Sequence, residues 1–238
     1  MTDPTPPTRH GANRRQLREI AICGLFIDDE SVVVDVGANI GLYTRAFCRS
    51  AARCFAFEPH PEAFAALVRD SPANCIPHNL ALSNRDGLAE LNTPASGAGL
   101  HTELSSLEKR TPEAFRGMLD LPPEYAVRTE TVRVARLDTV FDGATLDLIK
   151  LDVEGHELEV LEGAGETLRR CRPAVYVELE DIHRAGTRQR VTEHLLDGGY
   201  RGYFVEGGKL SPIARFQAQR HQVMSDYDSY VRNFLFLP

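Results

Sequence analysis

The sequence contains no apolar run that approaches the length of a membrane-spanning helix. Its first ten residues, MTDPTPPTRH, also lack the apolar core that defines a secretory signal. These two absences argue against an integral membrane protein and against a secreted one. We therefore expect a protein without a membrane span that works in the cytoplasm.

Cysteine pairs with metal-binding or redox spacing are missing as well. The five cysteines form no CxxC pair, and their odd number indicates reduced, buried thiols. Acidic residues outnumber basic ones, which gives a net charge of −7. A surface that follows the phosphates of a nucleic acid is therefore a poor fit, and we expect no nucleic-acid partner.

The chain is long enough for one sizeable core, with 238 residues of which 42% are hydrophobic. We predict a flexible tail over residues 1–12 and a single domain over residues 13–238. The parts expected within that domain are an N-terminal helix (13–26), a core (31–205) and two lid-like segments (about 94–128 and 206–232). The N-terminal helix covers the sheet edge or a bound cofactor, or it forms the contact of a homodimer; the sequence leaves these alternatives open.

The stretch VVVDVGANIG, Val32–Gly41, is the part around which the chain is organised. Its β-branched valines predict a short buried strand, and Gly37 and Gly41 bracket a tight turn before an amphipathic helix. Such a turn brings backbone N–H groups close to a ligand. A dinucleotide fingerprint needs three glycines as G-x-G-x-x-G, and this stretch has two as G-x-x-x-G. That count weighs against a nicotinamide cofactor without excluding one.

Two further segments follow with polar residues at strand ends. Arg53–Glu58 reads as a strand, and a carboxylate at its end can accept both ribose hydroxyls of a nucleoside. The alternative for Glu58 is a surface carboxylate before a turn. Asn74–Leu82 reads as a third strand, with Asn79 and Ala81 at the edge where ligands collect in such sheets. Asn79 is equally understandable as a turn former.

The second informative stretch is DLIKLDV, Asp147–Val153. Its apolar residues suit a buried parallel strand, but Lys150, Asp152 and Glu154 interrupt that pattern, and charges at such a position need a partner or a function. The next strand, Ala174–Glu180, also ends in carboxylates. Asp152 and Glu178 can therefore converge as ligands of Mg²⁺. The alternative is a carboxylate paired with Lys150 or Arg172, and both interpretations stay open.

With both stretches in view, the chain resembles the FkbM family of methyltransferases from about Val32 to Glu180. The segments that carry the resemblance are DVGANIG (35–41), FEP (57–59), NLALSNRDG (79–87), SSL (105–107), LDTV (137–140), IKLDVEGHELEVLEGA (149–164) and VELE (177–180). The segment IKLDVEGHE is the most specific of them. His156 departs from the family pattern, which more often has a small residue there.

The resemblance implies an α/β fold of the Rossmann-like class I methyltransferase type. Its core is a doubly wound, seven-stranded, mostly parallel sheet with helices on both faces. The resemblance also implies S-adenosylmethionine as the cofactor and methyl transfer to a hydroxyl oxygen. The acceptor is then a saccharide or sugar-containing metabolite, with a polyketide or another secondary metabolite as the alternative.

The same resemblance implies roles for individual residues. Near the methionine end of the cofactor we place Asp35, Gly37, Ala38, Asn39 and Gly41, with Glu58 at the ribose and Asn79 and Ala81 at the adenine. His156 is the candidate base, although it can equally be a helix-start residue without chemistry. Lys150 and Glu154 position the acceptor, and Asp152 and Glu178 are the candidate Mg²⁺ ligands.

Three other classes of protein were weighed against this hypothesis. A nicotinamide-dependent oxidoreductase lacks the third glycine. A catalytically silent binding module gives no reason to keep charges at two adjacent strand ends. A nucleic-acid methyltransferase fits neither the acidic balance nor the absence of an NPPY-like tetrapeptide.

Overall fold

The computed structural model describes residues 9–96, 99–109, 126–223 and 229–238, and of residues 9–15 only the backbone. Helix α1 (Arg9–Cys23) begins inside the segment 1–12 that was predicted to be a tail, and residues 1–8 lie outside the described residues. The helix continues into the short η1 (Gly24–Phe26). None of the helices in the described segments combines the length and the apolar character that crossing a bilayer requires.

The main sheet has eight strands among the described residues, in the order β11-β10-β12-β9-β8-β1-β2-β3. The five strands from β9 to β3 are parallel to one another. Beyond β9, each strand is antiparallel to the strand before it in the order β9-β12-β10-β11. Their bounds are β1 (Val32–Val36), β2 (Arg53–Phe57), β3 (Cys75–His78), β8 (Leu148–Leu151), β9 (Ala174–Glu178), β10 (Arg201–Glu206), β11 (Lys209–Pro212) and β12 (Asn233–Leu237).

The eighth strand corrects the predicted count of seven. Gly207 and Gly208 both have positive φ, 57° and 76°, which is the geometry of a two-residue hairpin turn. The chain therefore folds back after β10 and adds β11 at the sheet edge. On its other edge, β10 pairs with β12.

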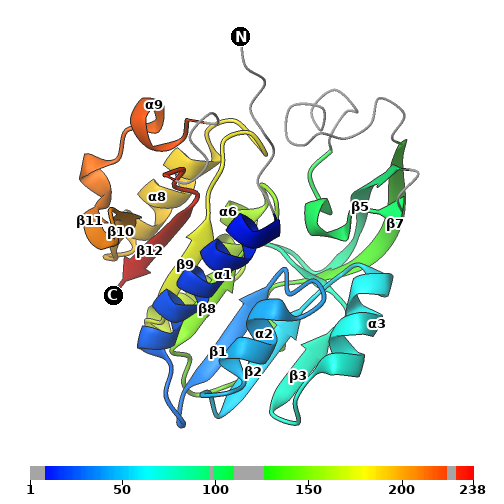
Figure 1. The fold of residues 1–238 in the computed structure, drawn as a ribbon. Helices are drawn as coiled ribbons and strands as arrows, with labels where there is room; N and C mark the ends of the chain where they lie inside the picture. Colours follow the sequence, from blue (N-terminus) through cyan, green and yellow to red (C-terminus); the bar gives the residue numbers. More distant parts are fainter. Residues whose placement is uncertain (1–8, 97–98, 110–125, 224–228) are drawn as a thin grey trace.

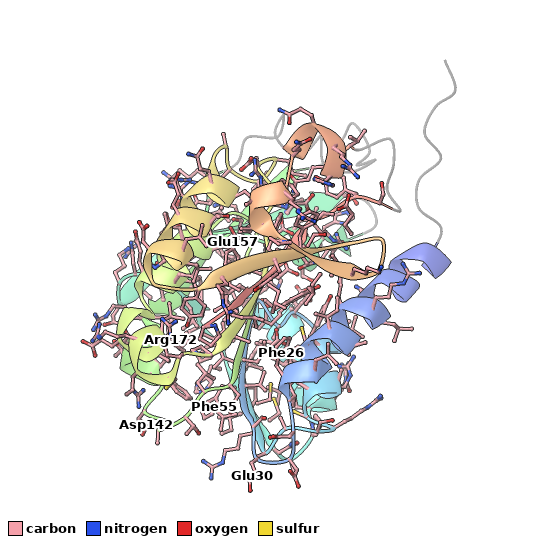
Figure 2. The ribbon with its side chains drawn as sticks, turned by 90° about the vertical axis from the view of Figure 1, so that its left-hand side faces the viewer. Phe26, Glu30, Phe55, Asp142, Glu157 and Arg172 are labelled. Carbon is pink, nitrogen blue, oxygen red and sulfur yellow. The ribbon has the colours of Figure 1, made fainter. Side chains whose placement is uncertain are left out.

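Helices cover both faces of the main sheet (Figures 1 and 2), as the sequence predicted. Val33 packs with Cys23 of α1 and Phe47 of α2 (Leu42–Phe47), whereas Val34 packs with Leu161 on the opposite face. The other helices are α3 (Pro61–Asp70), α5 (Leu137–Val140), α6 (Glu157–Glu162), α7 (Gly165–Cys171), α8 (Thr187–Asp197) and α9 (Ala218–His221), with the short η3 (Ile213–Arg215). Alternate residues of the central strands are thus buried on opposite faces.

A second sheet stands beside the carboxyl ends of the main strands (Figure 1). It has the order β4-β7-β5-β6, with bounds β4 (Ala81–Leu82), β5 (Gly87–Ser96), β6 (Gly99–Leu100) and β7 (Ala126–Ala135). The third strand predicted at the start of Asn74–Leu82 is confirmed as β3 of the main sheet, and the exit of that stretch forms the two-residue β4 of the second sheet. Of the predicted lid-like segment 94–128, residues 97–98 and 110–125 lie outside the described residues.

The helix expected after Gly155 is divided into α6 and α7. The chain bends at Gly163, where a Cβ atom would lie 1.9 Å from the carbonyl oxygen of Ser83. The Gly163 carbonyl also accepts a hydrogen bond from the backbone N–H of Asp138. This glycine therefore lets the main-sheet helices pack directly against the backbone that leads into the second sheet.

We expect Gly163→Ala to destabilise the protein by about 2 kcal/mol, since the added methyl group overlaps backbone that has no flexible end to move away. Gly165→Ala is the matched control, because its Cβ would meet open space at the start of α7. Urea unfolding measures the difference in stability, as the shift of the denaturation midpoint between variants that have the same m value. Equal midpoints for the two variants would show that the close approach at Gly163 carries no energy.

Candidate active site

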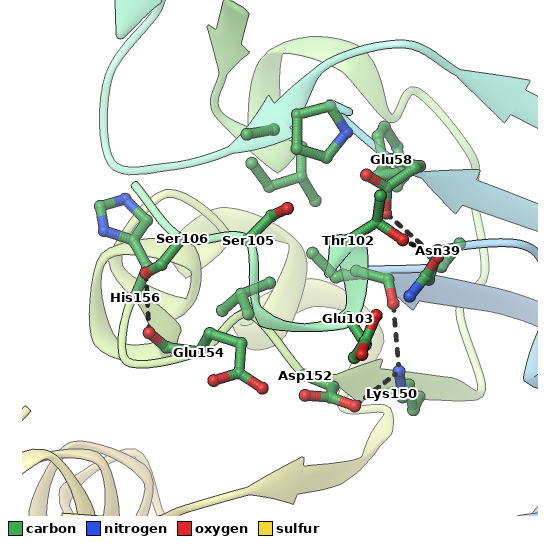
Figure 3. A pocket seen from close by; sticks show the side chains of 18 of the residues that line it. Asn39, Glu58, Thr102, Glu103, Ser105, Ser106, Lys150, Asp152, Glu154 and His156 are labelled. Carbon is green, nitrogen blue, oxygen red and sulfur yellow. Dashed lines mark hydrogen bonds and ion pairs between the residues drawn. The ribbon is translucent and has the colours of Figure 1, made fainter. Parts of the chain in front are cut away.

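A cavity of about 370 Å³ opens at the carboxyl ends of β1, β2 and β8. Figure 3 shows its labelled side chains, which come from the glycine turn, from the end of β2, from the stretch after β8 and from a cover segment, Thr102–Leu107. The cover begins with the short η2 (Thr102–Leu104) and is joined to β5 through paired backbone hydrogen bonds between Asn92 and Ser106. Gln16 of α1 reaches the same cavity.

A buried ion pair lies beneath the glycine turn. Asp35 and Lys150 face each other on the neighbouring strands β1 and β8, with 3.5 Å between Lys150 Nζ and Asp35 Oδ1. The Asp35 side chain is fully buried, and its second oxygen accepts a hydrogen bond of 2.6 Å from Thr44 Oγ1. Burial alone would lower the pKa of Lys150, but the neighbouring carboxylates raise it, Asp152 most and Asp35 next.

The glycine turn contains residues with positive φ, a backbone conformation that few residue types adopt readily. Gly37 has φ +74°, and a Cβ atom there would lie 1.8 Å from the carbonyl oxygen of Asp152. Asn39 has φ +48° although it carries a side chain. Its backbone N–H donates 2.8 Å to Glu58 Oε2, which holds the turn in that conformation.

Glu58 faces the cavity from the end of β2. Its other carboxylate oxygen, Oε1, accepts 2.7 Å from the backbone N–H of His60, so both oxygens are oriented by backbone donors. Burial raises the pKa of Glu58, and the hydrogen bonds from His60 and Asn39 oppose that shift, leaving a pKa of about 7. The carboxyl group is therefore fixed in place and titrates near neutral pH.

Only some of the residues predicted to bind the cofactor line the cavity. Gly37, Ala38, Asn39, Glu58 and Ala81 line it. The described lining does not include Asp35, Gly41 or Asn79. Asp35 lies below the turn, Gly41 precedes α2 with φ +85°, and Asn79 donates to the carbonyls of Glu58 and Pro59. These three residues support the turn and the β2 end from behind.

Asp152 and Glu178 lie near each other, but each has a cation beside it. Asp152 Oδ2 is 3.5 Å from Lys150 Nζ, and Glu178 Oε1 is 3.6 Å from Arg232 Nη1. Burial and the Asp152 carboxylate raise the pKa of Glu178 well above its usual range. Among the described residues, the groups of three or more possible metal ligands place Glu178 with Glu180 and His183, and none of them places Glu178 with Asp152. The geometry thus favours the ion-pair alternative over the metal alternative.

Glu154 lines the cavity and is backed by a histidine that the sequence analysis did not single out. Its Oε2 lies 2.8 Å from His183 Nδ1, and His183 Nε2 lies 3.4 Å from Glu180 Oε2. Burial would raise the pKa of Glu180, but hydrogen bonds, from His183 first, lower it to about 2. The backbone of Glu154 has φ +58°, and its carbonyl accepts 2.7 Å from Ser106 Oγ.

His156 also lines the cavity, and both of its ring nitrogens have partners. Nε2 lies 2.9 Å from Ser83 Oγ and Nδ1 lies 2.8 Å from Glu108 Oε1. Glu108 is additionally 3.3 Å from Arg184 Nη1. His156 therefore connects the cover segment to the backbone between the two sheets. Ser83 fell within a stretch quoted for the family resemblance, but no local signal pointed to Glu108 or His183.

The chain matches the Methyltransferase FkbM domain over residues 35–202, more than half of its length. It is similar to the hexuronic acid methyltransferase AglP of Haloferax volcanii, with 29% identity over 171 residues, 71% of this chain and 62% of AglP. It is also similar to the 2-O-methyltransferase NoeI of Sinorhizobium fredii, with 32% identity over 176 residues, 67% of this chain and 68% of NoeI.

Among solved structures, the FkbM methyltransferase of Methylobacillus flagellatus superposes with a TM-score of 0.54 at 17% identity. That match covers 88% of this chain and 44% of the other, and it supports the Rossmann-like methyltransferase fold. The two-glycine turn and the strand-end carboxylates are thus part of a methyltransferase-type domain. The chain belongs to the FkbM methyltransferase family, which confirms the resemblance found in the sequence. The nicotinamide-dependent alternative has no support in these relatives.

The raised pKa of Glu58 leads to a prediction for the binding of S-adenosylhomocysteine, the product form of the expected cofactor. Ribose hydroxyls donate to an ionised carboxylate, so binding favours the deprotonated form and releases a proton. Affinity should therefore rise about tenfold between pH 6 and pH 8, across the Glu58 pKa of about 7. Calorimetric titration at several pH values measures this change.

Glu58→Gln should bind more weakly and lose the pH dependence, because glutamine carries no titrating group. Glu62→Gln, an exposed position on α3, is the control and should keep the wild-type profile. A Glu58→Gln variant with an unchanged pH profile would show that another group is responsible.

Proposed function

We propose that this protein transfers the methyl group of S-adenosylmethionine to a hydroxyl oxygen of a saccharide or a sugar-containing metabolite. The observation that carries the proposal is one cavity with two charged ends, Glu58 on one side and Asp152 with Glu154 on the other. The names of AglP and NoeI support it, since one acts on a hexuronic acid and the other methylates a 2-hydroxyl. A polyketide or other secondary-metabolite hydroxyl is the alternative acceptor. A homodimer and a cytoplasmic location stay predictions.

The residues at the glycine turn fit the cofactor. Glu58 is held by two backbone donors, and each of its oxygens has a further lone pair for a ribose hydroxyl. Gly37 lets the turn pack against the Asp152 carbonyl, which occupies the place that a side chain would need. When bound, the cofactor supplies a methyl group on a sulfonium, which is a good leaving group. The protein then has two tasks, to align the acceptor oxygen and to remove its proton.

Proton removal falls to Glu154 in this proposal, in place of His156, the candidate base of the sequence analysis. The Glu154 carboxylate lines the cavity, and His183 behind it can share the proton. His156 has both ring nitrogens engaged and would first have to release Ser83 or Glu108. Glu154 would take up the proton that the acceptor oxygen loses as that oxygen is methylated.

A magnesium-assisted version of the reaction stays a prediction. The donor set at Asp152 and Glu178 fits it poorly, because Lys150 and Arg232 already lie beside these carboxylates. We therefore assign no step to a metal and derive the chemistry from the side chains alone.

We expect Glu154→Gln to lower kcat about 10²- to 10⁴-fold, the usual contribution of a general base. The affinity for S-adenosylhomocysteine should stay within about twofold, since Glu154 lies at the other end of the cavity from Glu58. His156→Gln should lower kcat less, because it changes the packing of the cover and leaves Glu154 in place. Methyl transfer from radiolabelled cofactor to a panel of glycosides measures these rates.

The control for this comparison is Glu90→Gln, a solvent-exposed carboxylate on β5 outside the described cavity lining, which should keep kcat close to wild type. If His156→Gln loses far more activity than Glu154→Gln, the base is His156 and the original hypothesis stands. If no glycoside is methylated while the cofactor binds, the saccharide acceptor is wrong.

Chelation tests the metal prediction separately. With EDTA in excess, the rate of methyl transfer should stay within about twofold of the untreated enzyme, because the strand-end carboxylates are balanced by protein cations. Full loss of activity that Mg²⁺ restores would establish the metal. Asp152→Asn should then weaken the Mg²⁺ dependence.

A further inference from the structure

The wall of the cavity opposite Glu58 carries three carboxylates and one ammonium group, with His183 Nδ1 2.8 Å from Glu154 and His101 Nδ1 3.6 Å from Glu103. Glu103 comes from the cover segment, and Asp152 and Glu154 come from the stretch after β8; all three line the cavity (Figure 3). Glu180 lies one layer deeper, beyond His183, and its lowered pKa keeps it ionised at neutral pH. Three strand or cover positions therefore direct carboxylates at the space that the acceptor has to enter.

The ammonium group on that wall already has carboxylate partners within the protein. Lys150 is the one lysine or arginine in the described lining, and its Nζ lies 3.5 Å from Asp35 as well as 3.5 Å from Asp152. One buried ammonium is thus shared between two carboxylates. Its hydrogen bond of 3.4 Å goes to the carbonyl of Gly37, which holds it beneath the turn.

The surrounding arginines are paired behind the wall. Arg232 lies 3.6 Å from Glu178 and 3.9 Å from Glu19, and Arg184 lies 2.6 Å from Glu159. Asp152 keeps about a third of its side chain exposed, whereas Lys150 is almost fully buried. A ligand therefore meets the carboxylate before it meets the ammonium.

We propose that the acceptor carries a positively charged amino group, as an amino sugar does, and that the cavity disfavours acceptors with a carboxylate. This inference rests on the proposed function and names the substrate class of the same site. Opposite charge at close range attracts the acceptor, and like charge at the same place repels it. A uronic acid would bring its carboxylate against Glu103, Asp152 and Glu154. On this point we expect the chain to differ from AglP, whose name specifies a hexuronic acid.

The test compares three methyl glycosides that differ in one group: the glucoside, the 2-amino-2-deoxyglucoside and the glucuronide. Each is titrated by ligand-observed saturation-transfer NMR against protein saturated with S-adenosylhomocysteine, which lacks the sulfonium charge. The buffer has low ionic strength so that charge effects are not screened. We expect the amino glycoside to bind at least about tenfold more tightly than the glucuronide, a ratio that corresponds to about 1.4 kcal/mol, with the neutral glucoside between them.

The double variant Glu103→Gln/Asp152→Asn should narrow that ratio to about threefold, since two of the three wall carboxylates are gone. Asp29→Asn/Glu30→Gln is the matched control. It removes the same two charges from exposed positions that precede β1, and Glu30 lies away from the cavity, at the opposite end of the sheet (Figure 2). This variant should keep the wild-type ranking.

Tighter or equal binding of the glucuronide overturns the inference and leaves the saccharide function standing. A ranking that the wall variant does not change also overturns it, because the selectivity then has another source. If none of the three glycosides binds while S-adenosylhomocysteine does, the saccharide acceptor itself is wrong, and the inference fails with it.

Discussion

The buried pair of Asp35 and Lys150 is the interaction on which the site depends. It joins β1 to β8 at one register position, and the same ammonium lies 4.7 Å from the centre of the Tyr43 ring in α2. One cation thus connects both central strands, the turn above them and the helix that follows. Removing either partner would leave a buried charge without compensation, which typically costs about 3–5 kcal/mol. Asp35 therefore supports the glycine turn from below.

Strained backbone is concentrated where the two ends of the cavity are built. Asn39 and Glu154 adopt left-handed conformations that residues with side chains rarely adopt, and both line the cavity. The Asn39 N–H donates to Glu58, and the Asn39 side-chain oxygen accepts 3.1 Å from Thr102 Oγ1 of the cover. The Glu154 carbonyl accepts from Ser106 of the cover. The cover segment is therefore hydrogen-bonded to both left-handed residues.

Local sequence patterns were sufficient to predict the central strand, the glycine turn and two of the carboxylates that line the cavity. The valines of β1, the glycine turn and the strand-end positions of Glu58 and Asp152 follow from neighbours in the sequence, and the structure places them as expected. Features that depend on distant segments were missed. The sequence could not show that Asn74–Leu82 divides between two sheets, since both halves look like strand. The sequence also could not pair Glu154 with His183, because His183 lies in a turn far along the chain. Nor could it decide between ion pairs and a metal at Asp152 and Glu178, because Arg232, the partner of Glu178, is more distant still.

The position of β12 has a consequence for how the protein is made. This strand comes last among the eight, yet it lies between β9 and β10 and is hydrogen-bonded to both. During synthesis β9 and β10 emerge with open edges that wait for residues 233–237 before the main sheet can close. Exposed strand edges of this kind are starting points for association with other chains. A chain that lacks residues 233–237 would therefore have an incomplete main sheet, with two open strand edges on β9 and β10.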